Sequence, residues 1–447
     1  MTSQMELADR VLDMVGQRAS AEVRVVGGVS ALTRFANSFI HQNVAEEGAL
    51  VLLRVAAGGR VASASTTATA SATADVLRRW VEATLEGALL QPPDSDWPGL
   101  AEPFPAPDIN HYDPATARAS PAERAQAVRA FVESGPGMRA AGYCETLDQQ
   151  IAFANSAGQH VEGRATRAVI DGIHQTETSA GSGHAASARL ADLNPGAVGE
   201  LAARRALDSI EAVDVEPGEY QVVLAPECVA TIAIFLAFYG FNAKMHQEGM
   251  SFARVGVGQF DPAFRLWDDA TDPRAVGVGF DEEGTPKRRL ELVTGGVTAG
   301  LAHDRRTAHK AGRASTGHAL TVSGARYGPI PTNLFVGGRE TPAEELVGAV
   351  ERGIYVSTFN YCRVLDPKTL VVTGLTRNGT FLIEGGMPAG AVSNLRFTQS
   401  FVAGLGPGRL LGVGGDARLA DSEFGPGLAH VPSLRLAGWQ FTGGAAG

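Results

Sequence analysis

The chain has 447 residues, of which 44% are hydrophobic and 19% are charged. This length and balance predict a globular protein of two to three domains and exclude a disordered chain. The formal net charge of −10 argues against non-specific binding to nucleic acid, which requires a basic surface.

The three cysteines are far apart in sequence and none belongs to a CxxC pair, which argues against a disulfide scaffold or a structural zinc cluster. The first residues, MTSQMELADRVLDMVGQ, lack the apolar core of a signal peptide. The longest apolar helix candidate, residues 229–239, is shorter than the roughly 20 residues that cross a bilayer. We therefore expect a cytoplasmic protein with no membrane partner.

The first half of the chain mixes helical and strand patterns. Hydrophobic periodicity predicts helices over 5–15, 74–90, 120–133 and 194–212, and strands over 22–26, 31–41, 142–144, 150–155 and 167–174. Residues 49–66 predict a hairpin that turns at Gly58-Gly59, and Ser120 with Glu123 predicts a capping box. The small and polar segment 179–188 is expected to be a strand edge or a loop.

The turn at residues 216–219 is the predicted domain boundary. We expect an N-terminal α+β domain over 1–215 and a C-terminal strand-rich domain over 216–447. In the second domain the pattern predicts a strand over 220–224 and a buried helix over 228–239. A second capping box at Thr341 predicts a helix that ends at Gly353, and glycine turns separate short strands in the remainder. Because helices do not alternate regularly with strands, the predicted class is α+β.

Several short motifs occur in a fixed order along most of the chain. They are LTRFANS (32–38), ANS (154–156), DEEGTP (281–286), TPAEEL (341–346) and FLIEGG (381–386). Taken together, these motifs resemble those of the TldD/PmbA (TldD/TldE) metallopeptidase family. The resemblance implies a fold of the TldD/PmbA type over nearly the whole chain.

Catalytic members of that family carry a HExxxH helix and a distant cysteine, which would hold zinc and supply a general base. Here the corresponding positions are Ile234, Phe235 and Tyr239, and no cysteine lies near 412–416. Alkyl and phenyl groups donate no lone pair, and a neutral phenol is a poor zinc ligand. The chain therefore resembles the noncatalytic TldE/PmbA-like branch, with no catalytic residue and no metal or other cofactor of its own. The resemblance implies zinc in a TldD-like HExxxH paralogue, with which this chain would form a heterodimer.

Other polar residues were weighed as sites. His246 and Glu248 could belong to a surface turn or to the rim of a cavity shared with a partner. His303, His309 and His318 share a stretch with four basic residues, including Arg313. A metal site, a solvated basic loop, and a loop that holds a peptide carboxylate or carbonyl are the three readings of that stretch. His246, Glu248, Arg313 and His318 are the predicted substrate-cavity residues.

Two cysteines invite a nucleophile hypothesis. Cys228 follows Glu227, whose charge would raise a thiol pKa, and Cys362 precedes Arg363 with no histidine close in sequence. Buried, inert thiols are the favoured interpretation of these two residues.

The resemblance favours a noncatalytic subunit of a TldD/TldE-type zinc metallopeptidase complex that degrades or matures unfolded peptides. This chain would close the cavity and hold the substrate as an added strand. Two alternatives stay open, namely a non-proteolytic homodimeric interaction protein and an independent hydrolase with an unrecognised site.

Overall fold

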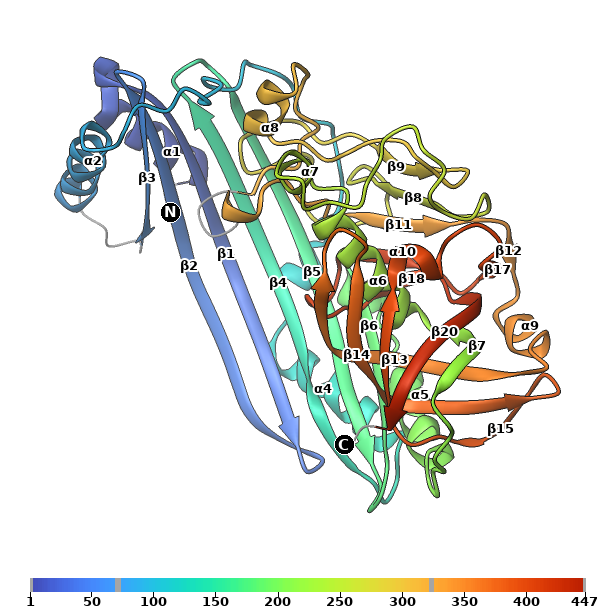
Figure 1. Cartoon of the computed structure of the whole chain (residues 1–447). Helices are drawn as coiled ribbons and strands as arrows, with labels where there is room; N and C mark the ends of the chain where they lie inside the picture. The colour runs from blue at the N-terminus through green and yellow to red at the C-terminus, as the bar shows by residue number, and fades with distance from the viewer. Residues whose placement is uncertain (1–2, 69–73, 321–324, 445–447) are drawn as a thin grey trace.

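The first half of the protein is built on one long antiparallel sheet. The computed structural model describes residues 3–68, 74–320 and 325–444. In the sheet order β3-β2-β1-β4-β5-β6, the strands lie side by side along the length of the molecule (Figure 1). Their bounds are β1 (Ser20–Ala36), β2 (Phe39–Ala57), β3 (Arg60–Ala68), β4 (Arg139–Asn155), β5 (His160–Gln175) and β6 (Ala180–Ser187).

Side chains alternate between the two faces of this sheet, as the pleat requires. Val23 and Val25 on β1 are fully buried in a core with α1 (Gln4–Val15) and α2 (Ala74–Leu89). Glu22 and Arg24 alternate with these valines along β1, so they lie on the opposite face of the sheet, beside the 281–286 loop. One face of the sheet therefore packs on helices, and one end of the other face meets the C-terminal half.

Three more helices accompany this sheet: α3 (Pro114–Ala117), α4 (Pro121–Glu133) and α5 (Pro195–Asp208). The predicted capping box at the start of α4 is confirmed, because Ser120 accepts a hydrogen bond from the Glu123 amide and Glu123 accepts one from the Ser120 amide. Phe131 of α4 packs against β1, β4 and β5. The predicted helices in this half all exist.

The second half contains two further sheets. The first has the order β10-β9-β8-β11-β19-β18, with bounds β8 (Arg265–Asp268), β9 (Leu290–Thr294), β10 (Val297–Thr298), β11 (Leu334–Gly337), β18 (Arg418–Ala420) and β19 (Ala429–Val431). The second has the order β12-β17-β20-β16-β14-β13-β7, and β15 pairs with β14. Its bounds are β7 (Gly218–Leu224), β12 (Glu340–Thr341), β13 (Arg352–Asp366), β14 (Val371–Glu384), β15 (Met387–Ala391), β16 (Leu395–Ser400), β17 (Leu410–Gly414) and β20 (Leu434–Gly444). Because β7 pairs with both β13 and β20, five of these strands close into a ring.

The helix α6 (Pro226–Tyr239) lies in the core of this half. Every residue of α6 from Pro226 to Ala237 is buried, as expected for a helix that is apolar on all sides. The other helices are short: α7 (Ala243–Gln247), α8 (Arg305–Lys310), α9 (Ala343–Gly348) and α10 (Phe401–Gly404). The predicted α+β class is confirmed. Over the described ranges, no helix is both long enough and apolar enough to cross a membrane.

Three local predictions are wrong. The strand predicted over 31–41 is interrupted, because Asn37 and Ser38 adopt positive φ angles of 49° and 65° and form the hairpin turn between β1 and β2. The predicted short strands of the first half are parts of strands of up to 19 residues. The capping box at Thr341 does not form, since Thr341 pairs with Gly414 as part of β12 and α9 begins after Pro342 without a side-chain cap.

The predicted end of α9 is also wrong. This helix ends at Gly348, and Gly353 lies in β13, where it pairs with Gln221 of β7. The segment 179–188, by contrast, contains the end strand β6 of the long sheet, as one of its two readings predicted.

Candidate functional site

The three degenerate metal-ligand positions lie on the C-terminal half of α6. Ile234 and Phe235 are 3% and 2% exposed and belong to the main core. The Phe235 ring has three aromatic neighbours, with centroid distances of 5.8 Å to Tyr239, 5.9 Å to Phe401 and 5.4 Å to Phe424. The place that would hold an ion in a HExxxH helix is therefore filled with aromatic carbon.

Tyr239 is the only one of the three positions with a heteroatom in its side chain. Burial raises the pKa of Tyr239, and the neighbouring Tyr327 adds to the rise. The phenol is therefore neutral at physiological pH and lacks the negative charge that would make it a zinc ligand. The segment 412–416 contains no sulfur, and its first residues are in β17.

A cavity of about 450 Å³ lies where the long sheet meets α6 and the closed ring of strands. Its walls come from β5, β6, α5, α6, β13, β14 and the segment that follows β18. Glu227 and Thr231, one turn apart on α6, line this cavity, whereas Phe235 one turn later does not. The first turns of α6 thus contribute polar side chains to the cavity, whereas the residues matched to the HExxxH positions later in α6 lie outside it.

Three ionisable side chains meet in this cavity. Asp171 on β5 and His184 on β6 are cross-strand partners, and Asp421 follows β18. One potential ligand atom from each residue lies within 4.8 Å of the other two. Burial raises the pKa of Asp421 to about 6, with a further rise from Asp171 and an opposing effect of His184. Glu227 contributes less to the local charge, because it forms a 2.8 Å ion pair with Arg418.

The sequence analysis did not single out these three residues. Asp171 and His184 are 13 positions apart around the turn between two strands, so the register of that hairpin could have placed them opposite each other. Asp421 comes from a distant part of the chain, and no local pattern connects it to the other two. The cluster is a product of tertiary packing.

The predicted substrate-cavity residues lie elsewhere. His246 and Arg313 are exposed, and Glu248 is exposed and pairs with Lys244 at 2.7 Å. His318 is fully buried, where its Nε2 lies 3.0 Å from Asp268 Oδ1 and its Nδ1 lies 2.9 Å from the Thr316 hydroxyl. None of the four lines the 450 Å³ cavity.

The stretch with three histidines is partly packed. Burial lowers the pKa of His303, and the charges of Arg313 and His246 lower it further, so these three residues are close in space. Within the described residues, the three histidines form no group with metal-ligand spacing. The solvated-loop interpretation fits residues 309–314, which are exposed, but three of the basic side chains also bind the proline-rich segment 91–108. Arg305 donates to the Gly99 carbonyl, Arg306 pairs with Asp94, and Lys310 pairs with Asp96.

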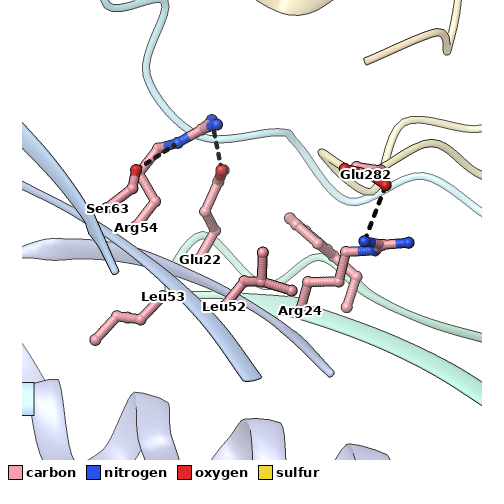
Figure 2. Close-up of a pocket in the computed structure, with 8 residues that line it drawn as sticks. Glu22, Arg24, Leu52, Leu53, Arg54, Ser63 and Glu282 are labelled. Atoms are coloured by element: carbon pink, nitrogen blue, oxygen red, sulfur yellow. Dashed lines mark hydrogen bonds and ion pairs between the residues drawn. The ribbon is translucent and has the colours of Figure 1, made fainter. Parts of the chain in front are cut away.

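A second, much smaller pocket of about 20 Å³ lies between β1, β2 and the 281–286 loop (Figure 2). Arg54 binds Glu22 at 2.7 Å and Glu283 at 3.1 Å, and Arg24 binds Glu282 at 3.0 Å. Burial raises the pKa of Glu22 to about 7, against the attraction of Arg54 and with a further rise from Glu283. These residues connect the DEEGTP loop to the long sheet and leave no room for a ligand.

The three cysteines are free and buried. Burial raises the pKa of each thiol, and Glu227 adds to the rise at Cys228 as predicted. The thiols therefore remain protonated, which fits the inert interpretation.

Comparison with known proteins identifies the family. The model of the PmbA/TldA metallopeptidase C-terminal domain matches residues 217–443, and that of the central domain matches residues 109–210. A curated metalloprotease of Synechocystis sp. is 33% identical over 165 residues, which is 35% of this chain and 35% of that protein. This chain therefore matches about a third of that relative's length.

Solved structures share the fold over nearly the whole chain. TldE from Thermococcus kodakarensis superposes with a TM-score of 0.84 at 17% identity, covering 98% of this chain and 99% of that one. A candidate modulator of DNA gyrase from Bacteroides thetaiotaomicron gives a TM-score of 0.83 at 20% identity, covering 99% and 100%. At these identities the likeness concerns the fold alone. The C-terminal model by itself covers half of the sequence, which confirms the resemblance found in the motifs: the chain belongs to the PmbA/TldD metallopeptidase family.

Proposed function

We propose that this protein is a noncatalytic subunit of a TldD/TldE-type zinc metallopeptidase complex that degrades or matures unfolded peptides. The observation that carries the proposal is that Ile234 and Phe235 are buried in the core and Tyr239 is partly buried against Phe235, so the residues matched to HExxxH offer no metal ligand. A HExxxH paralogue supplies the zinc, its bound water and the general base. The three free cysteines support a reducing compartment such as the cytoplasm.

The long sheet offers an edge where an extended peptide can bind. Residues 49–57 of β2 pair with β3, but residues 39–48 pair with β1 on one side only. Over the described residues, no strand covers the other side of this ten-residue segment. Phe39 and Ile40, at its start, are 59% and 41% exposed. A peptide added here as a strand gains main-chain hydrogen bonds that read its extended shape more than its sequence.

The test is a peptidase assay on an unfolded, fluorescently labelled protein. Three samples are compared: this chain alone, its HExxxH paralogue alone, and the co-expressed pair. The proposal predicts no turnover by this chain and faster turnover by the pair than by the paralogue. Chelator-sensitive turnover by this chain alone would overturn it, and an unchanged rate with no co-purification would favour a non-proteolytic interaction protein.

The binding edge is tested in the same assay. Ile40→Lys places a charge at the free edge of β2 and is expected to slow turnover of the unfolded substrate by the pair. Val76→Lys is the matched control, because Val76 is a similarly exposed β-branched residue (46%) on α2, outside the edge segment. Equal rates for the two variants would exclude this edge as the substrate site.

A further inference from the structure

The cavity between the long sheet and α6 is lined by four carboxylates, two arginines (Arg205 and Arg377) and His184. Two of its four carboxylates are matched, since Glu227 pairs with Arg418 and Glu423 pairs with Arg363 at 3.1 Å. Among the described residues, no lysine or arginine forms an ion pair with Asp171 or Asp421. These two neighbouring carboxylates are only partly buried, but they repel each other, and a cation between them would remove that repulsion.

His184 lies close to both carboxylates. Its side chain is 4% exposed, and its Nδ1 lies 3.2 Å from Asp171 Oδ2. Its Nε2 is buried and has no hydrogen-bond partner. Buried imidazole nitrogens normally have a partner, so this nitrogen points to a ligand that the protein itself does not provide.

We propose that Asp171, His184 and Asp421 bind one Zn²⁺ ion in this cavity. The three residues come from β5, β6 and the segment after β18, so the ion connects the long sheet with the C-terminal half. Their ligand atoms lie within 4.8 Å of one another, and a tetrahedral zinc site needs about 3.4 Å between ligands, which small side-chain rotations supply.

The donor set favours zinc over the common hard cations. Mg²⁺ and Ca²⁺ take oxygen ligands almost exclusively, whereas Zn²⁺ accepts an imidazole nitrogen together with carboxylate oxygens. Three protein ligands leave one position open to water in the cavity.

This site is separate from the former ligand positions on α6. None of Ile234, Phe235 and Tyr239 lines the cavity, and none of the three proposed ligands is on α6. The zinc proposal can therefore be tested independently of the noncatalytic assignment. Zinc binding without peptidase activity supports both, whereas activity of the zinc-loaded chain would overturn only the noncatalytic assignment.

The test is a calorimetric titration of the full-length, chelator-treated chain with Zn²⁺. We expect one ion per chain, with affinity at least tenfold weaker in His184→Ala and in Asp421→Asn. His160→Ala is the matched control, since His160 forms an exposed pair with Asp9 that could bind zinc adventitiously, and its affinity should equal that of the wild type. Zinc should also raise the melting temperature of the wild type and not that of Asp421→Asn.

Three results would overturn the proposal: no stoichiometric zinc binding, wild-type affinity in both cavity variants, or a loss of binding in His160→Ala alone. Far-ultraviolet circular dichroism shows whether each variant is folded. If His184→Ala does not fold, Asp421→Asn decides, because the amide has the size of the carboxylate it replaces.

Discussion

Two of the polar contacts between the long sheet and the C-terminal half differ in the space beside them and in their charge balance. At the first, Arg54 binds both Glu22 and Glu283. The pocket beside Glu22 and Arg54 has a volume of only about 20 Å³, and Figure 2 shows the side chains that line it. At the second, Asp171 and Asp421 lack such an arginine and face a cavity of about 450 Å³. Similar residue types therefore form a closed structural contact in the first case and the proposed ligand site in the second.

The largest expected effect concerns the aromatic packing around Phe235 on α6, outside the open cavity. Phe235→Ala should lower the free energy of unfolding by about 4 kcal/mol, because it leaves a hole among Tyr239, Phe401 and Phe424. Urea denaturation measures the change. Phe104→Ala, at an exposed phenylalanine, is the control and should change stability by less than about 0.5 kcal/mol. A loss below about 1 kcal/mol for Phe235→Ala would mean that this region is not packed and could admit an ion.

The first of these contacts, formed by Arg54, Glu22 and Glu283, is the closed joint, and it depends on Arg54. Arg54→Ala should cost about 3 kcal/mol, because two buried carboxylates lose their cation. The matched control is Arg18→Ala, whose pair with Glu82 is about half exposed on both sides and should contribute less than about 1 kcal/mol. Equal effects in chemical denaturation would show that the joint is no more important than a surface pair.

The closed joint should also make stability depend on pH. The pKa of Glu22 is about 7 in the folded protein and 4.5 in the unfolded chain. Between these values the folded state keeps a proton that the unfolded state has lost, so stability falls as pH rises from about 4.5 to 7. Glu22→Gln should remove up to about 3 kcal/mol of this dependence. Parallel slopes of unfolding free energy against pH for the two proteins would contradict the buried, partly paired state of Glu22.

The smallest effect is expected in the open cavity. In the chelator-treated chain, Asp421→Asn should change stability by less than about 1 kcal/mol, because no arginine or lysine loses a partner among the described residues. Glu227→Gln on the wall of the same cavity should cost about 2 to 3 kcal/mol, since it removes the 2.8 Å partner of Arg418 and leaves only Asp416, at 4.0 Å. A large loss for Asp421→Asn without metal would show that the two polar contacts are alike.

Local sequence signals anticipated features that depend on neighbouring residues. The continuous apolar run of α6 indicated a buried helix, and Ser120 with Glu123 indicated a capping box. The same capping signal failed at Thr341, because pairing with Gly414 of a distant strand determined the local backbone. Local chemistry is thus a reliable guide only where long-range pairing does not compete with it.

The candidate site also contains one feature that the sequence predicted and one that only the structure revealed. The identities of Ile234, Phe235 and Tyr239 predicted the loss of metal ligands from the sequence alone. The joining of Asp171, His184 and Asp421 required the register of β5 and β6 and the return of the chain after β18. No spacing rule connects residues that only the packing of two halves brings together.

The central claim is that α6 cannot support catalysis, and the turnover of an unfolded protein by the isolated, zinc-loaded chain tests it most directly. Activity must be measured, because zinc content alone would not show whether the ion is bound at α6 or in the cavity by Asp171, His184 and Asp421. The account predicts no chelator-sensitive turnover by this chain and turnover once the HExxxH paralogue is added. Chelator-sensitive cleavage by the isolated chain would contradict it.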